Sequence, residues 1–148
     1  MLVALALLLQ AATHPLTGVA IQPGDAMIIR PESDGTVTII VPKADLARKL
    51  GPGEVRVSLK IQDKMTMLEV ENNDPKLLDY EAILVAPDGS TQGTSVCRVM
   101  ADGKPSFEAW PYKINELGLL NFRRTTETEI VCRQPSRGGG GSLKDAVE

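Results

Sequence analysis

The sequence is poor in aromatic residues and in histidine, and both shortages limit what the chain can do. In 148 residues it has one tryptophan, two tyrosines, two phenylalanines and one histidine. A metal site with several histidine ligands is therefore excluded. The one histidine, His14, lies in a segment rich in proline and glycine, which argues against a histidine-based catalytic triad. The scarcity of aromatic side chains argues against a sugar-cleaving enzyme.

Blocks of basic residues are also missing. The chain has 16 Lys and Arg against 19 Asp and Glu, for a net charge of -3. The nearest feature to such a block is the pair Arg123 and Arg124. Nucleic-acid binding needs a positive patch that neutralises phosphates, so we expect no nucleic-acid partner.

The apolar N-terminal run is too short to span a bilayer. It covers Met1 to Leu9 and is followed by small residues, whereas a membrane span needs about 20 apolar residues. Such a run is typical of a secretory signal, with cleavage expected after Ala12 or Thr13, although no Lys or Arg precedes it. We therefore expect residues 1–13 to direct export to the periplasm or the medium. Alternatives are a buried strand or helix, or a retained anchor that makes the membrane a partner.

The two cysteines support the same location. Cys97 and Cys132 stand 35 positions apart, unlike the close Cys-x-x-Cys spacing of redox pairs. Two cysteines in an exported chain usually pair. We expect a structural disulfide.

Alternating apolar residues indicate short β-strands. The clearest run has Val55, Val57, Leu59 and Ile61 on one face and charged or polar residues on the other. Turn signals such as Pro87-Asp88-Gly89-Ser90 separate the runs. The spacing predicts seven to nine strands in a two-sheet antiparallel sandwich, with a small β-barrel as the alternative. One short connector helix is expected over 43–50.

The chain divides into four expected parts. An apolar segment covers 1–13, an extended lead-in covers 14–25, a single β domain covers 26–134, and a flexible glycine-rich tail covers 135–148. The tail contains a Gly-Gly-Gly-Gly-Ser stretch that resembles a linker.

The spacing of Cys97 and Trp110, 13 residues apart, resembles the first cysteine and core tryptophan of an immunoglobulin domain. Cys132 follows Trp110 by only 22 residues, and Ile130 stands where the tyrosine corner would place a tyrosine. The resemblance therefore extends to sandwich architecture and implies no activity.

Two groups of residues are candidates for a site. The segment FEAWPY offers Trp110, Pro111 and Tyr112 as an interaction surface, although Trp110 is favoured as a core residue, with Phe107 and Phe122. An acidic set could serve a carboxylate-dependent hydrolase or a calcium ion, but its spacing matches no calcium loop. That set comprises Glu69, Glu71, Asp74, Asp79 and Glu81.

The leading hypothesis is a non-enzymatic exported domain that binds a protein or another partner of the cell envelope and needs no metal or other cofactor. The alternatives are a small carboxylate-dependent envelope hydrolase and an assembly or anchor subunit that keeps its N-terminal segment.

Overall fold

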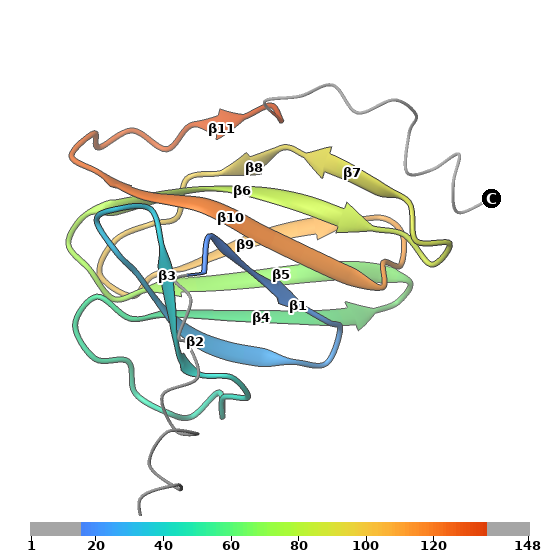
Figure 1. The fold of residues 1–148 in the computed structure, drawn as a ribbon, viewed down its shortest axis with the longest axis horizontal. Coiled ribbons are helices and arrows are strands. Elements are labelled where there is room, and N and C mark those ends of the chain that lie inside the picture. The colour runs from blue at the N-terminus through green and yellow to red at the C-terminus, as the bar shows by residue number, and fades with distance from the viewer. Residues whose placement is uncertain (1–15, 136–148) are drawn as a thin grey trace, which may run out of the picture.

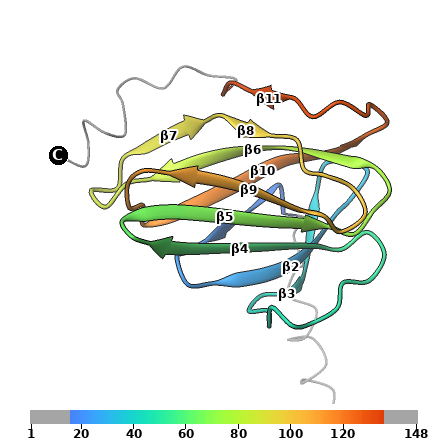
Figure 2. The same cartoon turned by 180° about the vertical axis from the view of Figure 1, so that it is seen from behind.

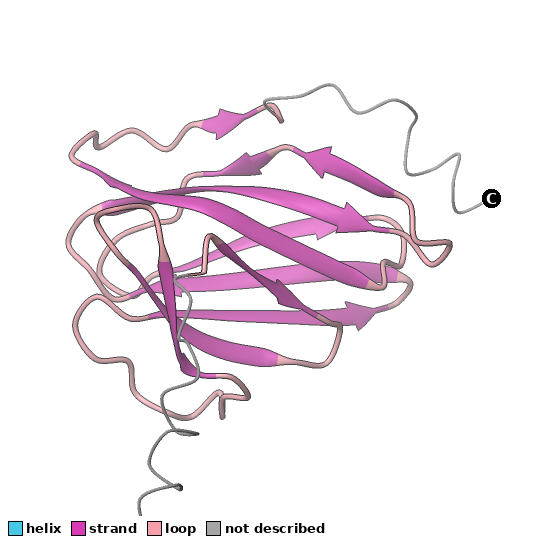
Figure 3. Ribbon diagram, in the orientation of Figure 1, coloured by secondary structure: helices cyan, strands magenta, loops and turns pink. Residues whose placement is uncertain are grey.

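The computed structural model describes residues 16–135, which form two antiparallel β-sheets packed face to face (Figures 1 and 3). Residues 1–15, with His14 and the apolar segment expected to direct export, and residues 136–148, with most of the glycine-rich tail, lie outside the described residues. The sheets do not close into a barrel, so the sandwich prediction is confirmed. Residues 16–135 contain no helix that could cross a membrane.

The five-stranded sheet has the order β3-β2-β4-β5-β9. Its strands are β2 (Ala26–Pro31), β3 (Val37–Val41), β4 (Val55–Gln62), β5 (Met65–Asn72) and β9 (Pro105–Trp110). β2 and β3 are neighbours in the sequence and pair antiparallel as a hairpin. Val55, Val57 and Leu59 of β4 are fully buried, as their alternation predicted, whereas Ile61 near the end of the strand is 38% exposed.

The four-stranded sheet has the order β1-β10-β6-β7. Its strands are β1 (Gly18–Ile21), β6 (Leu77–Val85), β7 (Thr91–Thr94) and β10 (Glu116–Thr125). β8 (Val96–Cys97) and β11 (Cys132–Arg133) pair in a separate two-stranded ribbon, which lies beyond β6 in both views (Figures 1 and 2). The two cysteines are opposite each other in this ribbon and form the predicted disulfide.

The first described residues connect both sheets. Leu16 bridges to Val37 of β3 in the five-stranded sheet, and β1 then pairs with β10 in the four-stranded sheet. Part of the segment expected as a lead-in over 14–25 therefore belongs to the sandwich. β1 lies so close to β10 that a Cβ atom on Gly18 would be 2.7 Å from the Leu119 carbonyl oxygen.

The opposite side of the sandwich is joined by side chains of β9. Ser106 accepts a hydrogen bond from the Met100 amide, and the Glu108 carboxylate accepts one from the Cys97 amide. Trp110 donates from its indole nitrogen to the Thr94 hydroxyl at 2.9 Å. These three side chains occupy alternate positions and therefore lie on one face of β9. They connect β9, at the edge of the five-stranded sheet, to the chain that runs along the edge of the four-stranded sheet.

Two local predictions were wrong. No helix forms over 43–50: the Asp45 carboxylate caps one turn, but Leu46 is exposed, so a short helix would bury no apolar face. Phe107 is 59% exposed rather than buried, because it shares the outer face of β9 with Pro105 and Ala109.

Candidate functional site

An open groove of about 820 Å³ lies on the outer face of the four-stranded sheet. β6 supplies its floor, because Glu81 and Ile83 point away from the core while Tyr80, Ala82 and Leu84 point into it. β10 supplies one wall through Leu120 and Asn121, and the segment after β11 supplies residues up to Pro135. The groove thus combines segments that are far apart in the sequence.

A bulge in β10 shapes this wall. The pairing of β10 with β6 shifts by one residue after Leu120, where Asn121 adopts a positive φ of 54°. Asparagine tolerates this left-handed conformation better than most residues. The Asn121 amide nitrogen donates to the Glu81 carboxylate at 2.8 Å, which fixes both side chains along the groove.

The bulge also changes which side chains face the core. Before it, Leu117 and Leu119 point inward; after it, Phe122 is the buried residue and stacks on Tyr80 with ring centroids 6.0 Å apart. Arg123 is consequently turned outward, toward the groove. Such re-aiming of side chains is the usual effect of a β-bulge.

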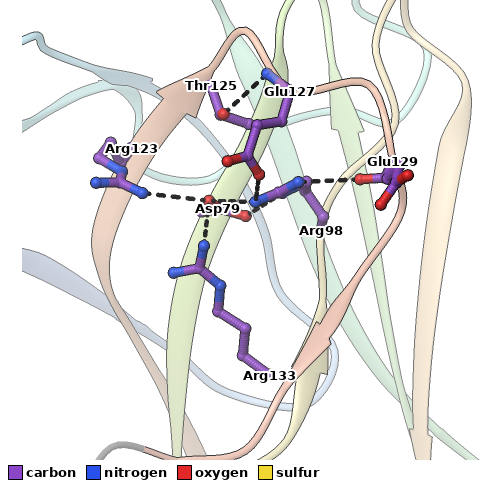
Figure 4. A network of polar contacts seen from close by, with 7 residues as sticks. All are labelled: Asp79, Arg98, Arg123, Thr125, Glu127, Glu129 and Arg133. Carbon is purple, nitrogen blue, oxygen red and sulfur yellow. Dashed lines mark hydrogen bonds and ion pairs between the residues drawn. The ribbon is translucent and has the colours of Figure 1, made fainter.

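A buried ion pair lies at one end of the groove (Figure 4). Arg98 donates from Nε to Asp79 Oδ1 at 2.6 Å and from Nη2 to Asp79 Oδ2 at 3.2 Å. Both side chains are buried, and the hydrogen bonds to Asp79 raise the pKa of Arg98 above its ordinary value. Arg98 also pairs with Glu127 and bonds the Glu129 carbonyl, so it holds the segment between β10 and β11.

Two further arginines converge on the same carboxylate (Figure 4). The Nη2 atoms of Arg123 and Arg133 lie 3.9 Å and 3.3 Å from Asp79 Oδ2. Their side chains remain 69% and 54% exposed, so both guanidinium groups are accessible to solvent. Asp79 therefore positions two accessible cations at the end of the groove.

The structure does not bring the predicted acidic set together. Glu69 and Glu71 lie on β5 and Asp79 and Glu81 on β6, in different sheets. Several of these carboxylates form ion pairs with arginines. The pairs are Arg56 with Glu71, Arg124 with Asp74 and Arg98 with Asp79. In the described part of the chain, no group of three or more acidic, histidine or cysteine side chains is arranged to hold a metal ion.

The aromatic candidates lie on the side of the sandwich that β9 closes. Trp110 is 6% exposed, so its core placement is confirmed and its indole is not available to a partner. Pro111 is exposed, whereas Tyr112 is half-buried against the core and its carbonyl accepts a hydrogen bond from Thr66. Binding by Pro111 and Tyr112 stays a prediction.

The comparisons with known proteins give no relative. No protein-family model, no curated protein and no solved structure matches the chain. The function must therefore be argued from the site.

Sequence reasoning missed the groove. Asp79 belongs to the predicted acidic set, but the structure buries it under three arginines from different segments. The sequence marks Arg123 only as half of a basic pair. A usable signal was Asn121, because an asparagine inside an apolar strand run is typical of a bulge.

Proposed function

We propose that the protein is an exported, non-enzymatic binding domain and that the groove over β6 is its binding site. The disulfide between Cys97 and Cys132 supports this location, because it is compatible with an oxidising compartment outside the cytoplasm. The apolar segment 1–13 of the sequence supports export to the periplasm or the medium.

The observation that carries the proposal is the fixed position of the accessible groups in the groove. Arg123 and Arg133 contact a buried carboxylate that Arg98 already holds, and Glu81 is held by Asn121. Side chains fixed before a ligand arrives lose less conformational entropy on binding. A groove of about 820 Å³ also has the size of a small-ligand site.

A thermal-shift screen tests the groove with two matched variants. Ile83 in the groove and Ile39 on β3 are both isoleucines in strands and both 37% exposed. A library of small metabolites, amphiphiles and short peptides is screened against the wild type, Ile83→Asp and Ile39→Asp. The proposal expects a ligand that stabilises the wild type and Ile39→Asp but not Ile83→Asp. Ligands that act equally on all three proteins would place binding elsewhere.

The intact mass tests the location. The protein is expressed with its own N-terminus and purified without reductant. We expect the loss of residues 1–12 or 1–13 and the mass deficit of one disulfide. A full-length mass with two free thiols would contradict export.

A further inference from the structure

The two ends of the groove differ in chemistry. At one end, Arg123 and Arg133 each have a guanidinium edge beyond their contact with Asp79. A guanidinium group has five N–H donors and suits bidentate binding of a carboxylate or phosphate. In residues 16–135 neither arginine makes another ion pair, so both retain donors for a ligand.

The local charge favours an anion at this end. Three arginines, at 98, 123 and 133, meet two carboxylates, those of Asp79 and Glu127. Glu127 contacts Arg98 and has no ion pair with the two exposed arginines. The positive charge in excess therefore lies on the accessible side chains that line the groove.

The other end presents the apolar side chain of Ile83 beside residues 91–94 of β7, which also line the groove. Asp79, Glu81 and Ile83 are successive outward residues of β6. Ile83 therefore lies about 13 Å along the strand from Asp79, at the usual rise per residue. Its neighbour across the pairing with β10 is Gly118, which carries no side chain, and Leu120 lies two pairs nearer the arginines. This arrangement leaves a strip over which an apolar chain can lie.

Between the two ends stands Glu81, opposite Leu120 and bonded to Asn121. A second negative group on the ligand, placed over the strip, would meet this carboxylate. The order of charge along the groove is thus positive, then negative, then apolar.

We propose that the groove binds an amphiphile with one anionic head group, with its carboxylate or phosphate between Arg123 and Arg133 and its apolar chain over Leu120 and Ile83. This inference rests on the proposed binding function and specifies its ligand class. Fatty-acid-like carboxylates and alkyl phosphates share the required chemistry.

The test compares four probes that share one alkyl chain, each kept below its micelle-forming concentration. They are decanoate, decyl phosphate, decanol and decyltrimethylammonium. Binding is followed by titration calorimetry and by amide shifts in a labelled protein. We expect an anionic probe to bind at least about tenfold tighter than decanol, with the largest shifts in β6, β10 and the segment 133–135. The stronger of the two anionic probes identifies carboxylate or phosphate as the source.

Charge-removing variants assign the anion site. Arg123→Gln with Arg133→Gln should reduce the anionic probe to the affinity of decanol, while Arg30→Gln, a matched change on β2 of the other sheet, should leave it unchanged. Arg98 still neutralises Asp79 in the double variant, so the fold should persist. Arg123→Gln alone, which removes the more distant contact, should give a partial loss and guards against misfolding.

Several outcomes would overturn the inference. Equal affinity for decanoate, decyl phosphate and decanol would contradict the proposed anion site. So would a preference for the anionic probes that persists in the double variant. If no decyl probe binds but another ligand is blocked by Ile83→Asp, the ligand class is wrong and the groove still binds. If Ile83→Asp and Ile39→Asp never differ, the proposed function fails as well.

Discussion

Removal of the disulfide offers a sharp test of how the C-terminal segment is held. The bridge joins residues 35 apart, and the closed loop contains both β9 and β10. In the variant Cys97→Ala with Cys132→Ala, those strands keep their partners β5 and β6, so the folded state changes little. The loss should come chiefly from a less restricted unfolded chain.

The expected magnitude follows from the loop length. For a loop of this size, the chain-entropy model gives about 4 kcal/mol. That is a large part of the 5–15 kcal/mol that stabilises a typical domain, as a rough scale. For a domain of this size it corresponds to a fall in melting temperature on the order of 15 °C.

The assay is urea unfolding followed by circular dichroism. Oxidised wild type, wild type with reductant and the double alanine variant are compared at one pH. The last two should agree with each other and lie about 4 kcal/mol below the first. A variant within about 1 kcal/mol of the oxidised protein would refute the reasoning, since the bridge would then not restrict the unfolded chain as the loop length requires.

Three further predictions concern single positions, each measured by thermal unfolding. Gly18→Ala should cost about 1–3 kcal/mol, because its Cβ would lie 2.7 Å from the Leu119 carbonyl oxygen, whereas Gly118→Ala meets nothing closer than 3.7 Å and should be tolerated. Equal melting points for the two would contradict this packing. Desolvation raises the pKa of Glu108, so folding favours its protonated form and this contribution is lost as pH rises. Glu108→Gln should therefore gain stability relative to wild type as the pH rises above the ordinary carboxyl pKa of 4.5, and a constant difference would count against it. Asn121→Val should cost about 1–2 kcal/mol through its positive φ, while Asn121→Gly should not; similar losses would implicate the side chain instead.

The strands were largely predictable because their signals are local. Alternation marks β4, and the turn at 87–90 marks the β6–β7 hairpin. The pairing of Cys97 with Cys132 followed from counting two cysteines in a chain whose apolar N-terminal run predicts export. Each of these predictions uses only neighbouring residues or the number of cysteines in the chain.

The errors arose where tertiary contacts decide. Residues 43–50 have helix-like spacing and charges but no apolar partner for Leu46, and a helix of two turns is not stable alone. Phe107 looked like a core residue by type, yet its strand phase directs it outward. Hydrophobicity alone does not give the face of an edge strand.

The candidate site was hardest to predict. The charged cluster combines residues from four separate segments, and a sequence does not show that they meet. They are Asp79 of β6, Arg98 after β8, Arg123 of β10 and Arg133 of β11. The one-residue shift at Asn121 also reverses the phase of β10, so a strict alternation would have assigned Arg123 to the wrong face.

The pairing of β1 with β10 sets the order in which the molecule can be completed. β1 is the first strand made, but its partner residues are synthesised roughly 100 residues later, which takes about 5–20 s at ordinary translation rates. Until then the four-stranded sheet lacks its second strand, although the β6–β7 hairpin can already form. A chain that leaves the cytoplasm as it is made would therefore cross the membrane before this sheet closes, and the final assembly would occur on the far side.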